Sequence, residues 1–284
     1  MTTAGTRLVA LLGHPVAHSR SPAMMSAACE CLGLEAVYVA CDVRADALGD
    51  AIRGLAALGA AGANVTVPHK IAAVSFCDRL DAQAAAIGAV NTLRFADGCV
   101  IGHNTDADGA VDAFRAAGVS LSGARVVVLG SGGAARAVAV GLARAGVAHV
   151  AVRARRAHAA QAVVVAVTAS GVHADADVLI ARDPAVARAD VIVQATSAGL
   201  DGAPDDDAVI AALDGARSGA FAMDVVYAPR ETRWLAAARA GGLRPVDGLG
   251  MLAGQAARAL SLWFDRAVAP DILRGFLDAS GARE

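Results

Sequence analysis

The sequence predicts an α/β protein of two lobes, each built around a mostly parallel sheet. Short apolar runs rich in Val and Ala alternate along the chain with longer Ala-rich stretches of helical character, which is typical of this class. Residues 126–129 are apolar at every position, as in a strand buried on both faces of a parallel sheet. Only 4% of the residues are aromatic although 56% are hydrophobic, so many small side chains must fill the core, as they do where helices cover a sheet closely.

In the first lobe, strands are predicted at residues 7–13, 36–43 and 63–67, with helices at 21–33 and 46–59. Pro22 suits the first turn of the first helix, where the missing N–H costs nothing. A further helix is expected from about His69. An antiparallel pair at 89–95 and 99–102 should follow, joined by Asp97-Gly98, a dipeptide that favours a tight hairpin. A long helix at 106–117 leads out of this lobe.

In the second lobe, strands are predicted at residues 126–129, 148–152, 190–195 and 220–226. Helices are expected from the glycine-rich turn after residue 129 to about Gly146, and at 156–170. The chain closes with helices at 251–264 and 270–279, which we expect to fold back onto the first lobe. The predicted division is therefore residues 1–106, completed by the helices of 248–284, and residues 107–247.

The composition excludes several classes of function. A net charge of -2 with dispersed basic residues gives no broad positive field of the kind that nucleic acids attract. The longest charge-poor stretch, residues 157–174, contains too many polar side chains for a bilayer span, so no membrane partner is expected. The five cysteines lack the paired spacing of zinc sites, and we interpret them as reduced thiols of a cytoplasmic protein. His14, His18, His69 and His103 show no metal-ligand spacing either, so no metal is expected.

A glycine-rich turn follows the apolar run at 126–129. Gly130, Gly132 and Ala135 match the G-x-G-x-x-G/A pattern of dinucleotide-binding turns between a strand and a helix. Gly130 permits the tight turn, and Gly132 lets backbone N–H groups approach a pyrophosphate at the positive end of the helix. Ser131, Gly133 and Ala134 complete the predicted cofactor loop. The alternative is a tight glycine turn without a ligand.

Three arginines stand where an NAD-binding protein would carry an acidic residue. About 20 residues after the glycine turn, an Asp or Glu usually holds the ribose hydroxyls of NAD, but this sequence has Arg153, Arg155 and Arg156. Guanidinium groups bind phosphate in bidentate fashion, whereas a carboxylate would repel the additional phosphate of NADP. The sequence therefore favours NADP as cofactor. The alternative, solvated arginines at a helix start, is opposed by the helix dipole.

Polar residues gather at the predicted ends of two strands in the first lobe. Asn64 and Thr66 lie on one face of a strand by the period of two, and Lys70 lies just beyond its end. Asp106 closes another strand end together with an amide and a hydroxyl. A lysine and an aspartate that converge there could transfer a proton to or from a hydroxyl during hydride transfer. The same two residues could equally form a surface salt bridge.

Ordered motifs along nearly the whole chain resemble the shikimate dehydrogenase family. They are GHPVAHSRSP at 13–22, NVTVPHK at 64–70, GAVNT at 88–92, NTD at 104–106, the glycine turn, ATSAG at 195–199, DVVYxP at 224–229 and GLGMLxxQA at 248–256. The resemblance implies that Ser19 and Ser21 bind a substrate carboxylate, that Lys70 is catalytic and that Asp106 is its partner. It implies further substrate contacts from Asn64, Thr66, Asn91, Tyr227 and Gln255, and cofactor contacts from Thr196, Val225, Gly248 and Met251.

The resemblance further implies a substrate-binding and catalytic domain at 1–106, completed by 248–284, and a Rossmann-type NADP-binding domain at 107–247. The implied activity is the reversible NADPH-dependent reduction of 3-dehydroshikimate to shikimate, a step of aromatic amino acid biosynthesis. The small-molecule substrate is the expected partner, and the protein is expected to be a monomer or a homodimer.

Some positions depart from the family pattern. Ala154 and Arg156 replace the usual neighbours of Arg155, Gln194 stands where Asn is common, and Met25-Ser26 replaces His-Asn. No catalytic group is lost, but the departures leave open a paralogue acting on quinate or aminoshikimate. A non-catalytic NADP-binding regulator on the same fold is the alternative of another class, and intact Lys70 and Asp106 argue against it. A fold relative acting on folate or another ligand has no support from the residues at Ser19, Ser21 and Asn91.

Overall fold

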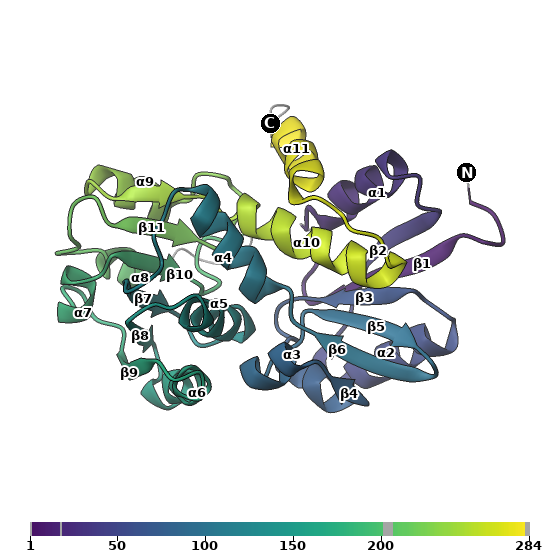
Figure 1. Cartoon of the computed structure of the whole chain (residues 1–284), viewed down its shortest axis with the longest axis horizontal. Coiled ribbons are helices and arrows are strands. Elements are labelled where there is room, and N and C mark those ends of the chain that lie inside the picture. Colours follow the sequence, from purple (N-terminus) through teal and green to yellow (C-terminus); the bar gives the residue numbers. More distant parts are fainter. Residues whose placement is uncertain (1, 18, 201–206, 282–284) are drawn as a thin grey trace. The chain divides into compact units, whose positions relative to one another are not determined.

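The computed structural model describes residues 2–17, 19–200 and 207–281 and divides the chain into two compact units (Figure 1). Unit 1 comprises residues 1–105 and 253–284, and unit 2 comprises residues 106–252. Among the described residues each unit has its own six-stranded sheet with helices packed against it, so the predicted α/β class is confirmed. None of the described helices has both the length and the apolar character needed to cross a bilayer.

Unit 1 is formed by the N-terminal third of the chain and its last helices. Its strands are β1 (Arg7–Gly13), β2 (Ala36–Asp42), β3 (Gly62–Val65), β4 (Arg79–Leu80), β5 (Thr92–Ala96) and β6 (Cys99–His103). Its helices are α1 (Ser21–Cys31), α2 (Leu48–Ala57), α3 (Ala82–Ile87), most of α10 (Leu249–Phe264) and α11 (Pro270–Gly281), with short 3-10 helices η1 (Ala45–Ala47) and η2 (Ala72–Phe76).

The strand directions in unit 1 bring several chain segments to one edge of its sheet. The order is β2-β1-β3-β5-β6-β4. Strands β1, β2 and β3 are parallel, while β5 runs antiparallel to both β3 and β6. The carboxyl ends of β1, β3 and β6 therefore meet the amino end of β5 at the same edge. The β5–β6 connection is the predicted hairpin, with Asp97 and Gly98 both at positive φ.

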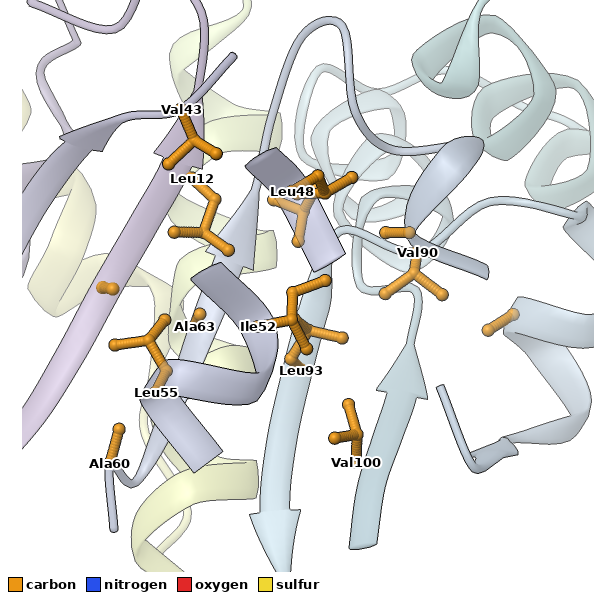
Figure 2. Packing of buried hydrophobic residues seen from close by; sticks show 14 residues of the cluster. Leu12, Val43, Leu48, Ile52, Leu55, Ala60, Ala63, Val90, Leu93 and Val100 are labelled. Atoms are coloured by element: carbon orange, nitrogen blue, oxygen red, sulfur yellow. The ribbon is translucent and has the colours of Figure 1, made fainter. Parts of the chain in front are cut away.

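Helix α2 covers one face of this sheet with a narrow apolar stripe. Figure 2 shows Leu48, Ile52 and Leu55 of α2 facing the apolar side chains of β1, β3 and β5. The spacing of three and four residues places these three side chains on one side of the helix. On the sheet, Ala63 and Val65 face this cluster, so Gly62 and Asn64 point to the opposite face.

Helix α10 covers that opposite face. The indole N–H of Trp263 donates a hydrogen bond to the carbonyl of Leu93 (2.8 Å). A side chain at Gly62 would overlap the Trp263 indole, so glycine is required there for the helix to approach. The last helices thus complete the unit that the N-terminal segment begins.

The helix predicted from about His69 is wrong. The chain instead makes a turn at residues 66–69 and a five-residue 3-10 helix, η2, before the short strand β4 and helix α3. The N–H of Cys77 donates to the carbonyl of Val74, which ends η2. The N–H of Asp78 donates to the carbonyl of Val100 on β6, so the chain pairs with the sheet directly after η2. Pairing with the sheet edge, which the local sequence does not reveal, overrides helix propensity here.

Unit 2 has a fully parallel sheet in the order β12-β11-β10-β7-β8-β9. The strands are β7 (Arg125–Leu129), β8 (His149–Ala154), β9 (His173–Val178), β10 (Val191–Gln194), β11 (Phe221–Asp224) and β12 (Arg244–Val246). The helices are α4 (Asp106–Ala116), α5 (Gly133–Arg144), α6 (Ala157–Thr168), α7 (Pro184–Ala187), α8 (Asp207–Ala211) and α9 (Arg233–Ala240). The order reverses between β7 and β10, as in the doubly wound dinucleotide-binding fold, whose ligands bind at that point.

Two edge strands of unit 2 were not predicted. Strand β9 alternates Ala with acidic residues and lacks a strong apolar signal, and β12 contains Pro245. Both lie at the edges of the sheet, where exposed polar residues and proline are tolerated because one side of the strand needs no partner.

Candidate active site

Buried amide and hydroxyl groups collect at the shared edge of the unit 1 sheet. Asn64 on β3 lies opposite Thr92 on β5, which in turn lies opposite His103 on β6. Asn91 precedes Thr92, and Thr105 follows two residues after His103, so both lie at this edge. Asn64, Asn91, Thr92, Asn104 and Thr105 are all buried. Buried polar groups of this kind require partners, and they find them in one another.

Asn91 is the centre of this network and is only 2% exposed. Its Oδ1 accepts a hydrogen bond from the N–H of Thr105 (2.8 Å), and its Nδ2 donates to Oγ1 of Thr105 (2.9 Å). The same Nδ2 lies 3.4 Å from Oε1 of Gln255 on α10. Asn91 therefore joins the hairpin strands to α10, and the two residues Asn91 and Gln255, both predicted to contact substrate, lie together.

The side chain of Asn64 makes three hydrogen bonds on the sheet face that α10 covers. Its Nδ2 donates to the carbonyl of Asn91 and to Oγ1 of Thr92, both at 3.2 Å. Its Oδ1 accepts from the hydroxyl of Tyr38 on β2 (2.8 Å). Tyr38 was not predicted, because nothing near it in the sequence distinguishes it from an ordinary core aromatic.

Replacing Asn91 with Ala is expected to lower the free energy of unfolding by about 3 kcal/mol, since it leaves the buried N–H of Thr105 and other polar groups without partners. Urea unfolding followed by intrinsic fluorescence measures this change. The control is Gln161→Ala, which removes an exposed amide on α6 and should change stability by about 0.5 kcal/mol or less. If Asn91→Ala lowered the free energy of unfolding no more than the control does, the network would not contribute to stability.

Lys70 lies beside this polar edge and is half-buried. The turn that carries it is closed by the N–H of His69 bonding to the carbonyl of Thr66 (2.8 Å). The buried imidazole of His69 anchors the turn through Nε2, 2.6 Å from the carbonyl of Val43. The carbonyl of Lys70 accepts from the N–H of Val90 (2.8 Å), so the lysine backbone is fixed next to Asn91.

The loop after β1 reaches the same edge. The N–H of His14 bonds to the carbonyl of Val67 (3.0 Å), and a Cβ at Gly13 would lie 2.4 Å from the Thr66 methyl group. The loop leads to Ser19, whose Oγ accepts from the N–H of Ser21 (3.2 Å), the first residue of α1. Ser19, Ser21, Asn64, Thr66, Asn91, Lys70 and Gln255 thus all belong to unit 1.

Two histidines of unit 1, His14 and His103, contact aspartate side chains. Nδ1 of His14 lies 2.6 Å from Asp42, and Nδ1 of His103 lies 2.7 Å from Asp81. His18 lies outside the described residues. No group of three or more His, Cys, Asp or Glu side chains suited to a metal occurs in the part of the chain that the structure describes.

Asp106 and Tyr227 belong to unit 2. Asp106 is the buried first residue of α4 and is bonded directly to Thr105, which belongs to unit 1. Tyr227 is half-buried in the loop after β11.

The predicted cofactor residues of unit 2 follow the carboxyl ends of five adjacent strands. Gly130, Ser131, Gly132, Gly133 and Ala134 follow β7, and Arg155 and Arg156 follow β8. Thr196 follows β10, Val225 follows β11, and Gly248 and Met251 follow β12. In a parallel sheet these ends lie along one edge, which is where such folds bind dinucleotides.

The glycine turn fits a phosphate-binding role. Gly130 has φ +118°, and an added Cβ would lie 2.8 Å from the carbonyl oxygen of Ala195, so only glycine suits this position. Gly132 precedes α5, and an added Cβ there would meet nothing within 4 Å. The space beside the backbone of Gly132, at the positive end of α5, is therefore not filled by neighbouring protein atoms, as an anion site there requires.

The three arginines differ in their surroundings. Arg153 is buried, and its guanidinium pairs with Asp183 through Nε and with Asp175 through Nη1 (2.7 Å). These contacts connect β8 to β9 and α7, so the guanidinium of Arg153 is already paired within unit 2. Arg155 and Arg156 are exposed, and no ion pair to either occurs in the described part of the chain. Both guanidinium groups remain available to a phosphate.

The carboxyl group of Asp224 at the end of β11 is fully buried. Burial raises the pKa of Asp224 to about 7, although hydrogen bonds from Thr232 and Val226 act in the lowering direction. The folded protein therefore binds this proton more tightly than the unfolded chain does, where the pKa has its ordinary value of 3.8.

This difference predicts a pH-dependent contribution to stability. Protonated Asp224 adds to the free energy of unfolding. This stabilisation is complete below about pH 4 and is lost as the pH rises through about 7. The difference in unfolding free energy between wild type and Asp224→Asn should fall by about 1.4 kcal/mol for each pH unit in this window, because the variant does not titrate. Urea unfolding at a series of pH values measures it. A difference that does not change with pH would mean that Asp224 stays charged.

Two family models match the chain. The model described as shikimate dehydrogenase substrate binding domain matches residues 11–93. The model described as shikimate / quinate 5-dehydrogenase matches residues 112–231. A protein of Moorella thermoacetica named shikimate dehydrogenase (NADP+) is 42% identical over 284 residues, which cover 98% of this chain and 96% of that protein.

Solved structures of similar fold cover nearly the whole chain as well. Shikimate 5-dehydrogenase from Thermus thermophilus, in complex with NADP(H) and shikimate, matches with a TM-score of 0.82 at 36% identity and covers 97% of this chain and 100% of that one. The ligand-free 5-ketofructose reductase of a Gluconobacter strain matches with a TM-score of 0.83 at 33% identity and covers 98% of this chain and 100% of that one.

Proposed function

The chain belongs to the shikimate dehydrogenase family, and from this premise we propose that it catalyses the reversible NADPH-dependent reduction of 3-dehydroshikimate to shikimate. The reaction is a step of aromatic amino acid biosynthesis. We further propose a cytoplasmic location, which is supported by five cysteines that are all free thiols.

The observation that carries the proposal is the row of polar groups at the edge of the unit 1 sheet. Asn64, Thr66 and Asn91 place amide and hydroxyl groups beside Lys70, where hydroxyls of a ligand would exchange with hydrogen bonds that the two amides now make within the network. A ring with several hydroxyl groups needs such a surface, because each hydroxyl donates one hydrogen bond and accepts others. Ser19 and Ser21 supply hydroxyls for the carboxylate of the same ligand.

Lys70 is proposed as the proton donor and as the charge that stabilises the developing alkoxide. It is the only lysine of the chain, whereas every other basic side chain besides histidine is an arginine, which does not release its proton in proteins. An ammonium group beside the ketone stabilises negative charge where it forms. Asp106 orients Lys70 and the neighbouring hydroxyl, and the pair acts as a unit in proton transfer.

The residues of unit 2 fit a phosphorylated dinucleotide, whose reduced form supplies the hydride when bound. The open backbone after β7, with Gly130, Ser131, Gly132, Gly133 and Ala134, would hold the pyrophosphate at the end of α5. Arg155 and Arg156 would hold the additional phosphate. Thr196, Val225, Gly248 and Met251 lie at the adjoining strand ends and would line the rest of the cofactor. Tyr227 and Gln255 would complete the contacts to substrate.

A spectrophotometric survey tests the proposal. Shikimate, quinate, aminoshikimate and the reduced partner of 5-ketofructose are each oxidised with NADP+ and with NAD+, and absorbance of the reduced nicotinamide is followed. The highest kcat/KM is expected for shikimate with NADP+. A preference for quinate or aminoshikimate would identify a paralogue, and binding of NADP+ without turnover of any of the four would favour a regulator.

A further inference from the structure

One buried carboxylate connects the loops that follow β10 and β11 in unit 2. Asp224 is the last residue of β11 and pairs in register with Gln194, the last residue of β10. Its Oδ1 accepts hydrogen bonds from the N–H of Val226 (2.9 Å) and from Nε2 of Gln194 (3.2 Å). Its Oδ2 accepts from the hydroxyl of Thr232 (2.6 Å). Three donors therefore converge on one side chain that is 0% exposed.

Gln194 extends this connection into the loop after β10. Its Oε1 accepts from the N–H of Thr196 (2.5 Å), and its Nε2 also donates to the carbonyl of Ala198 (3.0 Å). The shape of residues 195–198 is thus set by the Gln194 amide. Asp224 supports the orientation of that amide, because its Oδ1 accepts a hydrogen bond from the same Nε2 and ties it to β11.

Val226 and Thr232 extend the connection into the loop after β11. The N–H of Val226 is fixed by Oδ1 of Asp224, which determines the path of the backbone at Val225. The Oγ1 of Thr232 accepts from the N–H of Leu235 and caps α9. A Cβ at Gly248 would lie 2.8 Å from the carbonyl oxygen of Asp224, so the backbone after β12 packs directly against the backbone of Asp224.

We propose that Asp224 is a positioning residue for the cofactor, which fixes the loops at 195–198 and 225–227 through Gln194 and Val226 so that their backbones are preorganised for the dinucleotide. The inference rests on the proposed function, which places Thr196, Val225 and Gly248 against that ligand. Asp224 itself has no exposed surface and acts through its hydrogen-bonded neighbours. Preorganised loops bind without the cost of ordering them.

If Asp224 only stabilised the fold, its replacement would affect stability and not the binding of NADP+. Loss of a buried hydrogen-bonded carboxylate destabilises a protein whatever lies nearby, but the variant that remains folded would then bind NADP+ as well as wild type does. A positioning role instead raises the dissociation constant of the folded variant and leaves turnover at saturating NADP+ nearly unchanged.

The test uses Asp224→Ala, Asp224→Asn and the exposed control Asp214→Asn in the full-length protein. Calorimetric titration with NADP+ is expected to give a dissociation constant at least about tenfold higher in Asp224→Ala, because both loops lose their anchor. Asp224→Asn should stay within about threefold of wild type, since Asn keeps the Oδ1 acceptor for Gln194 and Val226. Hydrogen exchange should accelerate at residues 195–198 and 225–230 in Asp224→Ala only.

If Asp224→Ala does not fold, Gln194→Met replaces it. Met has nearly the volume of Gln but offers no amide, so the loop at 195–198 alone should exchange faster, and NADP+ should bind at least about fivefold more weakly. Wild-type affinity in a folded Asp224→Ala or Gln194→Met protein overturns the inference. Binding is measured without substrate, so a wild type that binds NADP+ but does not oxidise shikimate refutes the proposed function while the role of Asp224 is still decided.

Discussion

Replacing Lys70 with Met lowers kcat for shikimate oxidation by at least about a thousandfold, according to the proposed mechanism. General acid–base catalysis alone accounts for about 10²–10⁴ in rate, and loss of a charge that stabilises a developing alkoxide adds to it. Met is unbranched like Lys and keeps most of its length without the charge, so the fold of the turn at residues 66–70 should survive. Steady-state kinetics with shikimate and NADP+ measures the loss.

Two further measurements separate chemistry from binding. The affinity for NADP+ is expected to stay within about twofold of wild type, since the variant removes a group proposed to act on substrate. Because the chain has a single lysine, nitrogen-15 labelling of lysine gives one Nζ resonance, and shikimate should shift it in the wild-type protein. Lys70 would have no part in the mechanism if Lys70→Met turned over near the wild-type rate. The same conclusion would follow if shikimate did not shift the Nζ resonance of the wild-type protein.

Part of the candidate site could be predicted from the periodicity of the strands. Asn64, Thr66 and Lys70 follow from the period of two and from the end of an apolar run, and the structure places all three at one sheet edge. Gln255 could be named only from family resemblance, because 164 residues separate it from Asn91. Tyr38 could not be predicted at all, since its partner Asn64 lies on another strand.

The same limit applies to charge. Arg153 and Arg155 are two residues apart and indistinguishable by type, yet the first is buried against carboxylates and the second is exposed. The difference arises from Asp175 and Asp183, which are 22 and 30 residues away from Arg153 and reach it only in the folded sheet. Local patterns therefore identified the class of fold and the family, which the comparisons confirm, but not the partners of individual charges.

Replacing both Arg155 and Arg156 with Ala is expected to lower kcat/KM for NADP+ about a hundredfold and to leave kcat/KM for NAD+ nearly unchanged. A hydrogen bond to a charged group contributes about 1.5–3 kcal/mol, and a tenfold change in affinity corresponds to about 1.4 kcal/mol. Two guanidinium groups on one phosphate account for a factor of this size. NAD+ lacks that phosphate and therefore loses nothing.

The preference for NADP+ should also weaken in wild type as salt concentration rises, because both arginines are exposed and screened by salt. The control is Arg188→Ala, which removes another exposed arginine of unit 2 and should leave the ratio of kcat/KM for NADP+ over NAD+ unaltered. If the double variant loses activity equally with both cofactors, the arginines support the fold of the loop rather than the phosphate. If the double variant keeps its activity with both cofactors, the additional phosphate of NADP+ is bound elsewhere. The absence of an acidic residue at the end of β8 would then be the remaining physical reason for a preference for NADP+ over NAD+.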